Sequence, residues 1–210
     1  MRSGESITVG IAGGSGAGKT TFVRRLLDEL PHGSTTILSH DAYYRDLAHL
    51  TPDERATTNF DHPDSLETAL LCDHIDSLRR GSGVDVPTYD FTTHARGSRT
   101  TRAAPTSTLI VEGILILADE ELRSLVDLAV YIDVEPDARL ARRMERDIRE
   151  RGRSAESVIR QWRETVKPMY DQFVRPSRGF ADIIVPHGGD NRMAARIVAA
   201  YVGGRTRATR

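Results

Sequence analysis

A glycine-rich segment with one lysine is the first part of this sequence whose residues are spaced for chemistry. It extends from Gly13 to Thr20 and reads GGSGAGKT, which fits the pattern G-x-x-x-x-G-K-[ST] at every position. Small residues let backbone N–H groups curl around phosphate oxygens, and a following helix adds the positive end of its dipole. The pattern predicts a loop that binds a nucleoside triphosphate, formed by Gly13, Gly14, Ser15, Gly16, Ala17, Gly18, Lys19, Thr20 and Thr21.

Three side chains complete the expected phosphate and metal chemistry. Lys19, one of only two lysines in the chain, should reach the β- and γ-phosphates, and the Thr20 hydroxyl should bind Mg²⁺. Glu112 ends the apolar segment LIVE, where a buried carboxylate is costly unless it meets a cation. We therefore predict that Glu112 belongs to the Mg²⁺ shell, directly or through water; the alternative is a carboxylate that faces solvent at the end of a strand.

A second carboxylate, Asp41, lies in the segment SHDAYYRD directly after another apolar run. It should therefore lie at the carboxyl edge of a sheet, where open α/β sheets bind their ligands. A carboxylate at that edge could accept the proton of an attacking hydroxyl group. Since Asp is also a common helix N-cap, the alternative interpretation of Asp41 is structural.

The elements around these segments alternate between strands and helices. Apolar runs predict strands at 7–12, 35–39, 106–117, 127–134 and 181–186. Helical spacing predicts helices at 22–30, 63–81, 136–152, 154–174 and 191–202, with a kink or restart at Pro168. Polar, β-favouring residues from about 84 to 104 predict a projecting hairpin. The order is typical of an α/β protein with a three-layer, P-loop NTPase-type parallel sheet flanked by helices.

Length and charge limit the classes of protein. The 210 residues predict one domain, residues 1–204, with a disordered tail at 205–210. A net charge of −1 argues against a strongly basic nucleic-acid binder. One cysteine excludes a disulfide framework, and the apolar runs are too short for a membrane span. With no apolar core of a signal peptide at the start, we expect a cytoplasmic protein that binds neither nucleic acid nor membrane.

The positive charge is concentrated between residues 139 and 163, which hold nine arginines and four acidic residues, a local balance of +5. One interpretation is a solvated helix face with ion pairs four residues apart, and a second is a nucleic-acid surface. The third is an arginine-rich helical lid that closes over a triphosphate, because planar guanidinium groups bind phosphate through two bonds. We favour the lid for Arg143, Arg146, Arg151 and Arg153.

Longer motifs carry a resemblance to a known family. In chain order they are SHDAYYRD (39–46), NFDHPDSLE (59–67), PTYDFTTHAR (87–96), VEG (111–113), RRMERDIRERGR (142–153), VKPMYDQFV (166–174) and ADIIVPHGGDN (181–191). With the glycine-rich loop they resemble the uridine kinase (uridine–cytidine kinase) family from about residue 7 to residue 200. The resemblance implies transfer of the γ-phosphoryl group of ATP to the ribose 5′-hydroxyl of uridine and cytidine, yielding UMP and CMP in pyrimidine salvage.

The resemblance also implies roles for individual residues. Asp41 matches the family's catalytic carboxylate, which takes the proton of the 5′-hydroxyl. Matches to the nucleoside pocket are Tyr44, Phe60, Asp61, Tyr89, Phe91 and His94, together with Arg143, Arg153 and Gln161 from the lid. Arg146 and Arg151 match lid arginines that meet the ATP phosphates, and residues 186–191 match a loop beside the adenine. The resemblance further implies a homo-oligomer, with a homotetramer as the expected form, and inhibition by UTP and CTP.

Two alternatives remain at this level. The first is a kinase for another small hydroxylated metabolite, similar to phosphoribulokinase or pantothenate kinase. The second is a non-catalytic protein gated by a nucleotide, although such a protein has no use for a second polar and aromatic pocket. One residue departs from the family pattern, because His187 stands where the family usually has an arginine, and this bears on the choice of phosphate donor.

Overall fold

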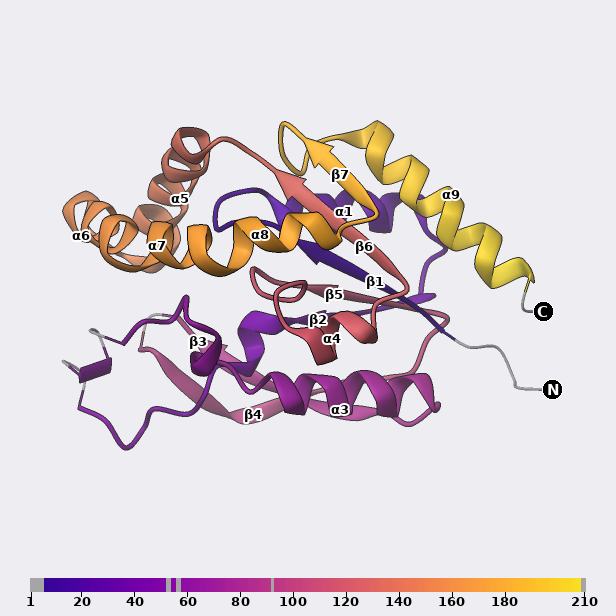
Figure 1. Ribbon diagram of the computed structural model, residues 1–210. Coiled ribbons are helices and arrows are strands. Elements are labelled where there is room, and N and C mark those ends of the chain that lie inside the picture. Colours follow the sequence, from indigo (N-terminus) through magenta and orange to yellow (C-terminus); the bar gives the residue numbers. More distant parts are fainter. Residues whose placement is uncertain (1–5, 52–53, 56–57, 92, 209–210) are drawn as a thin grey trace.

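A five-stranded parallel sheet forms the centre of the computed structural model, which describes residues 6–51, 54–55, 58–91 and 93–208. The strand order is β2-β5-β1-β6-β7 (Figure 1), with bounds β1 (Ile7–Ala12), β2 (Thr35–Ser39), β5 (Thr108–Glu112), β6 (Leu128–Asp133) and β7 (Ile183–Pro186). Every neighbouring pair in this sheet is parallel. The predicted three-layer α/β fold is therefore confirmed.

Both faces of the sheet are covered, which explains why the inner strands β1, β5 and β6 are mostly apolar and buried. Along β1, Ile7, Val9 and Ile11 pack in one core with Phe22 of helix α1 (Lys19–Glu29) and with helix α9 (Arg192–Ala208). The opposite core contains Ala12 and the buried side of helix α3 (Thr68–Arg79). Successive side chains of a strand thus enter different layers, as the pleat requires.

The predicted strand at 106–117 is too long. Strand β5 ends at Glu112, and the Gly113 N–H donates to the Ile11 carbonyl at 3.1 Å. Residues 114–117 leave the sheet but stay buried in the core, and helix α4 (Glu120–Ser124) follows them. A continuous apolar run predicts buried residues but not where a strand ends, and here the residues after β5 are buried as well.

The predicted helix at 63–81 begins five residues too early. Residues Pro63–Ser65 form a separate 3₁₀ turn, in which the Asp64 N–H donates to His62 Nδ1 at 3.2 Å. Leu66 then pairs with Tyr44 in an isolated β-bridge, and α3 starts at Thr68. Proline and aspartate at the start of an apolar run therefore initiate a turn here and not the helix itself.

The arginine-rich segment forms helix α5 (Pro136–Arg151), which stops at Gly152 with φ of 64°. Helix α6 (Ala155–Gln161) leads through a π-helical turn (Trp162–Val166) into α7 (Lys167–Met169), and a second π-helical turn (Tyr170–Val174) leads into α8 (Arg175–Ser177). The interruption predicted at Pro168 takes the form of these wide turns, because a π-helical turn accommodates a residue that cannot donate the usual backbone bond. Figure 1 shows α5 and α6 beyond the carboxyl ends of the strands, at the end of the molecule opposite the two termini.

The predicted hairpin is confirmed as strands β3 (Val84–Asp90) and β4 (Ala95–Ala103), which form a separate two-stranded antiparallel sheet. The register shifts between Pro87 and Tyr89. Arg96 fastens the hairpin to the rest of the fold: its Nη1 lies 2.7 Å from Glu67 Oε2, and its Nη2 donates to the Tyr44 carbonyl at 2.8 Å.

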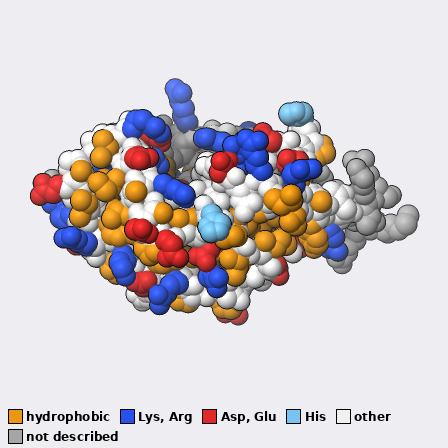
Figure 2. All heavy atoms as spheres, turned by 90° about the horizontal axis from the view of Figure 1, so that it is seen from above, with side chains coloured by type: hydrophobic (Ala, Val, Ile, Leu, Met, Phe, Trp, Pro, Cys, Tyr) orange, Lys and Arg blue, Asp and Glu red, His pale blue; other side chains and the backbone are white. Residues whose placement is uncertain are grey.

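The end of the chain differs from the prediction of a disordered tail. Helix α9 continues through Gly203 and Gly204 to Ala208, so the prediction is wrong for residues 205–208; the remainder of the predicted tail lies outside the described residues. Over the described part of the chain, no helix has both the length and the apolar character needed to cross a membrane. On the face seen in Figure 2, basic, acidic and hydrophobic side chains are interspersed.

Candidate active site

The carboxyl ends of three strands bring the predicted catalytic segments together. The glycine-rich loop follows β1, Asp41 follows β2, and Glu112 is the last residue of β5. In the sheet register, Glu112 is paired with Ile11 on one side and with Ser39 on the other. Glu112 is therefore at the centre of this edge, between the loop and the segment that carries Asp41.

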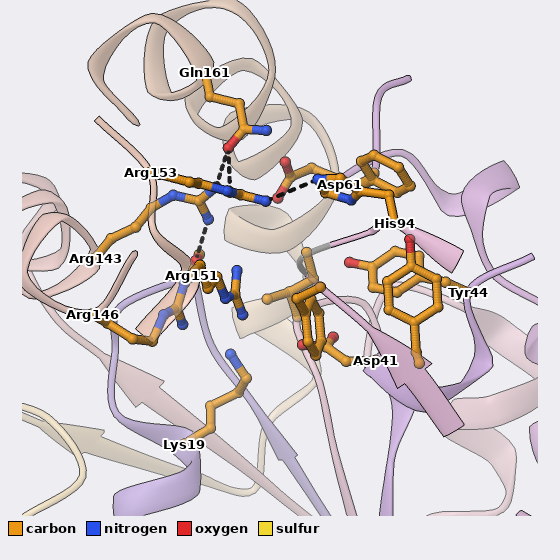
Figure 3. Close-up of a pocket in the computed structure, with 15 residues that line it drawn as sticks. Lys19, Asp41, Tyr44, Asp61, His94, Arg143, Arg146, Arg151, Arg153 and Gln161 are labelled. Carbon is orange, nitrogen blue, oxygen red and sulfur yellow. Dashed lines mark hydrogen bonds between the residues drawn. The ribbon is translucent and has the colours of Figure 1, made fainter. Parts of the chain in front are cut away.

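A cleft opens at this edge (Figure 3). Its walls come from the glycine-rich loop, the turn after β2, the tip of the hairpin and helices α5 and α6. The residues that line it are Ser15, Lys19, Asp41, Tyr44, Phe60, Asp61, Tyr89, Phe91, His94, Ile114, Arg143, Arg146, Arg151, Arg153 and Gln161. The structure thus gathers one predicted catalytic lysine, one predicted base and the whole predicted nucleoside pocket around a single space.

The glycine-rich loop has the backbone that its sequence demands. Gly16 and Gly18 have φ of 80° and 93°, a region that disfavours side chains, and a Cβ on Gly16 would also overlap the backbone oxygen of Arg139. Lys19 Nζ lies against the loop and donates to the Gly13 carbonyl at 3.1 Å. Burial lowers the pKa of Lys19, while nearby Glu112 and Asp41 act in the opposite direction. Thr20 and Thr21, in the first turn of α1, are exposed.

Glu112 is suited to a cation. The Ser39 hydroxyl donates to Glu112 Oε1 at 2.9 Å, which fixes the carboxylate. Burial raises the pKa of Glu112; Lys19 opposes this and Asp41 adds to it. Within the described residues no cluster of three or more His, Cys, Asp or Glu forms a metal cage. Mg²⁺ in phosphoryl-transfer sites is commonly held by one or two carboxylates with the phosphates and water, so Glu112 and the Thr20 hydroxyl fit that ion.

Asp41 does not act as a helix cap. It lies inside a 3₁₀ turn (His40–Tyr43), whose N-cap position belongs to Ser39, and its side chain lines the cleft. The helix-cap alternative for Asp41 is therefore excluded. Its carboxylate is near enough to Lys19 and Glu112 to influence their pKa values, which places it beside the phosphate loop.

Aromatic rings form the wall farther from the loop. Tyr44 packs edge-on against Phe60 and Phe91, with ring centroids 5.6 and 6.4 Å away, and Tyr89 lies 4.9 Å from it. Phe60 and His94 are stacked at 4.5 Å with an angle of 15° between their planes. Such a wall suits a flat, partly apolar ligand.

Two polar atoms on this wall are buried without a hydrogen-bond partner among the described residues: the Tyr89 hydroxyl and His94 Nδ1. His94 Nε2 lies 3.2 Å from Arg153 Nη2. A guanidinium can only donate, so Nε2 must accept and Nδ1 must carry the proton. Burial lowers the pKa of His94, and Arg153 and Arg151 lower it further, which keeps the ring neutral. The cleft therefore offers one N–H donor and one hydroxyl to the polar edge of a ligand.

Asp61 supplies a partly buried acceptor. Burial raises the pKa of its carboxyl, although Arg143 acts to lower it, and the Thr165 hydroxyl donates to Asp61 Oδ2 at 3.4 Å. Asp61 lines the same cleft as His94 and Lys19 (Figure 3). A carboxylate in this position could accept bonds from the hydroxyl groups of a ligand.

The lid arginines point into the cleft from α5 and the loop after it (Figure 3). Arg143 connects the lid to the phosphate loop, donating to the Ser15 hydroxyl and to Gln161 Oε1, both at 2.7 Å. Arg153 also donates to Gln161 Oε1, at 2.9 Å. The Arg151 guanidinium lies 4.3 Å from the centre of the Phe91 ring. Four of the nine arginines in this segment therefore line the cleft.

Sequence reasoning missed three residues of the site or its support. Ile114 lines the cleft directly after Glu112 and Gly113, a position that adjacency could have suggested. Arg139 is buried, with its guanidinium 3.7 Å from the centre of the Tyr170 ring, and a Cβ on Gly14 would overlap its Nη1. Asp147 is buried among the lid arginines. Nothing in the sequence distinguishes Arg139 and Asp147 from the charged residues that surround them.

Comparisons with known proteins agree on the type of molecule. The model of the phosphoribulokinase/uridine kinase family matches residues 8–194. The uridine kinase of Streptococcus gordonii is 45% identical over 196 residues, 93% of each chain, and that of Brevibacillus brevis is 44% identical over 200 residues, 95% of this chain and 94% of the relative.

Solved structures share the fold at low identity. Phosphoribulokinase from Rhodobacter spheroides superimposes with a TM-score of 0.63 at 18% identity, covering 91% of this chain and 75% of its own. D-glycerate 3-kinase from Cryptococcus neoformans gives a TM-score of 0.58 at 16% identity, covering 80% and 79%. The scaffold is common to kinases with different acceptors, so the acceptor must be argued from the cleft.

Proposed function

The chain belongs to the phosphoribulokinase/uridine kinase family, and we propose that it transfers the γ-phosphoryl group of ATP to the ribose 5′-hydroxyl of uridine and cytidine. One observation carries this choice of acceptor: an aromatic pocket with two unpaired polar atoms adjoins the phosphate loop, and Asp41 and Lys19 line the same cleft. The names of the relatives at 44–45% identity support the same acceptor class. A nucleoside fits such a pocket because it joins a flat base to a hydroxylated sugar.

The chemistry requires little beyond positioning and charge. The transition state of phosphoryl transfer is loose, so the enzyme mainly aligns the attacking oxygen and neutralises charge on the phosphoryl oxygens. Asp41 orients the 5′-hydroxyl and accepts its proton. Lys19, Arg146 and Arg151 balance the charge of the phosphates. Mg²⁺, held by Thr20 and Glu112 with the phosphates, supplies further charge neutralisation when it is bound.

The pocket explains how both pyrimidines are accepted. With Nε2 occupied by Arg153, His94 offers its Nδ1 proton to the O4 carbonyl of uracil. The Tyr89 hydroxyl can donate or accept, so it can also take a proton from the N4 amine of cytosine. Phe91 packs against the ring, Asp61 accepts from the ribose hydroxyls, and Tyr44 and Phe60 close the pocket, as the family resemblance implies.

Low pH should reduce kcat/KM for uridine only below the ordinary pKa of histidine. The pKa of His94 is lowered by burial and by Arg153 and Arg151, so the neutral ring persists as the pH falls through 6.5. Protonation at lower pH removes the acceptor for Arg153. We therefore expect kcat/KM for uridine to stay level from pH 8 to 6.5 and to fall only at lower pH. A pH profile at saturating ATP measures this, with His94→Gln as the control that lacks the inflection; an inflection due to His94 at or above pH 6.5 would contradict the assignment.

2′-Deoxyuridine should be a poor substrate. Without the 2′-hydroxyl, the partly buried acceptor Asp61 loses a donor, which costs about 1–3 kcal/mol, or roughly 5- to 150-fold in kcat/KM. Side-by-side kinetics with uridine and 2′-deoxyuridine measure the ratio. In Asp61→Asn the ratio should shrink towards unity because both substrates lose the carboxylate. Equal turnover of the two nucleosides by the unaltered enzyme would overturn the role of Asp61.

The acceptor class is tested by measuring ADP release from ATP with different acceptors. Uridine and cytidine should stimulate ADP release strongly, whereas ribulose 5-phosphate and pantothenate should not, because they lack a ring for the aromatic wall. Stimulation by either of these and not by uridine would establish one of the other kinase activities on this scaffold. No stimulation by any acceptor would favour the nucleotide-gated binding protein.

The remaining parts of the proposal concern assembly and location. We propose a cytoplasmic homo-oligomer that binds neither nucleic acid nor membrane. Support for self-association comes from Met193, Ile197 and Tyr201, which are exposed hydrophobic side chains on α9. Sedimentation of the 23.3 kDa chain measures its assembly state directly.

A further inference from the structure

A single buried carboxylate lies at the centre of the arginine lid. The side chain of Asp147, on helix α5, has no exposed surface. Four guanidinium groups surround it within 4 Å: Nη2 of Arg146 at 2.8 Å, Nη1 of Arg153 at 3.2 Å, Nη1 of Arg151 at 3.5 Å and Nε of Arg143 at 3.6 Å. All four of these arginines line the cleft, whereas Asp147 does not.

Asp147 remains ionised in this position. Burial alone would raise the pKa of its carboxyl, but Arg143, Arg146 and Arg151 outweigh burial and lower it. One negative charge among four positive charges cannot neutralise them, so the cluster keeps an excess of positive charge beside the cleft. Four like charges held so close would separate without a shared counter-ion. The carboxylate therefore keeps the arginines together while leaving most of their charge for a ligand.

The four arginines depend on Asp147 to different degrees. Arg143 and Arg153 both donate to Gln161 Oε1, so a second anchor holds them. Arg146, in the part of the chain that the structure describes, makes its polar contacts with Asp147 alone, through Nε at 2.9 Å and Nη2 at 2.8 Å. Among the described residues, Arg151 contacts Asp147 and otherwise only the face of the Phe91 ring. Thus the two arginines assigned to the phosphates rely on Asp147 more than the two assigned to the nucleoside.

We propose that Asp147 is a positioning residue, which aims Arg146 and Arg151 at the triphosphate and acts on the donor side of the reaction rather than on nucleoside binding. The inference rests on the proposed phosphotransferase function. It assigns to a residue outside the cleft a larger effect on KM for ATP than on KM for uridine. If the ion pairs of Asp147 were purely structural, its loss would instead raise KM for ATP and for uridine to a similar extent.

The test is steady-state kinetics of Asp147→Asn, which keeps the shape of the side chain and removes its charge. We expect KM for ATP to rise and kcat to fall, with an overall loss of about 10- to 100-fold in kcat/KM for ATP. KM for uridine should change by less than about threefold, because Gln161 still holds Arg143 and Arg153. The matched control is Glu150→Gln on the same helix, an exposed carboxylate paired with Arg149 at 2.7 Å, which should behave as the unaltered enzyme. Equal rises in KM for ATP and for uridine, or kinetics unchanged from those of the unaltered enzyme, would overturn the proposal.

A double mutant separates positioning from general damage. If Asp147 acts through Arg146, then Asp147→Asn should cost much less in kcat/KM for ATP when Arg146 is already Gln. Additive losses would contradict that route. If Asp147→Asn does not fold, Asp147→Glu takes its place, because it keeps the charge but moves it by one methylene. This variant should retain part of the kcat/KM for ATP. Unchanged kinetics, or equal rises in KM for ATP and for uridine, would count against positioning. Uridine-dependent turnover by the unaltered enzyme in the same assay tests the proposed function separately.

Discussion

Replacing Asp41 by Asn is expected to lower kcat for uridine phosphorylation by about 10²- to 10⁴-fold. The amide keeps the size of the side chain but can no longer accept the proton of the 5′-hydroxyl. It also loses the charge that fixes the direction of this hydroxyl and that adds to the field around the metal site. Since Asp41 lines the cleft without forming the wall that holds the base, KM for uridine should change far less than kcat. Initial rates at saturating ATP and variable uridine measure both quantities.

The control for Asp41→Asn is Asp64→Asn, which alters a carboxylate that is 92% exposed and lies outside the cleft. This variant should keep the kcat of the unaltered enzyme. If Asp41→Asn retains near-full kcat while its fold is intact, another group must accept the proton, and the catalytic assignment is wrong.

Replacing Lys19 by Met is expected to lower kcat/KM for ATP by about 10³-fold, because it removes a charge that meets the phosphates in the ground state and in the transition state. Met has a similar length, so the loop should keep its shape apart from the bond from Nζ to the Gly13 carbonyl. The loss should extend to kcat even at saturating ATP, since charge develops on the phosphoryl oxygens during transfer.

The chain offers a matched control for the lysine. Lys167 is the other lysine of the sequence, and it lies in an exposed ion pair with Asp171 at 2.6 Å. Lys167→Met should leave ATP kinetics unchanged, because exposed ion pairs of this kind contribute little. If both variants lose activity equally, or if Lys19→Met retains it, Lys19 does not have the role assigned by the loop.

The strands that carry the catalytic segments were predictable because local pattern determines them. Both 7–12 and 35–39 are short apolar runs with β-branched residues, and the structure has strands at these residues. The start of α3 was not predictable, since it depends on the pairing of Leu66 with Tyr44, 22 residues earlier in the chain. The same is true of the end of β5, where burial continues through Ile114–Leu117 although the hydrogen-bond ladder has stopped.

The composition of the cleft was predictable from motifs, but its internal contacts were not. The bond between Arg153 and His94, which fixes the histidine tautomer, joins residues 59 positions apart. The arginines of α5 have equal helical propensity and equal charge, so their pattern does not reveal that Arg139 is buried. Likewise, the net charge of −1 does not reveal that four arginine side chains of the lid surround the buried carboxylate of Asp147. These features arise from tertiary packing and required the structure.

The central claim is that the cleft delivers the γ-phosphoryl group to the 5′-hydroxyl of a pyrimidine nucleoside. The most direct measurement follows the γ-phosphate of labelled ATP in the presence of uridine, or of 5′-deoxyuridine, which lacks the attacking hydroxyl but keeps the base and the other ribose hydroxyls. The account predicts label in UMP, one per ADP formed, and no label in 5′-deoxyuridine. Label that appears only as inorganic phosphate, or that also enters 5′-deoxyuridine, would contradict it.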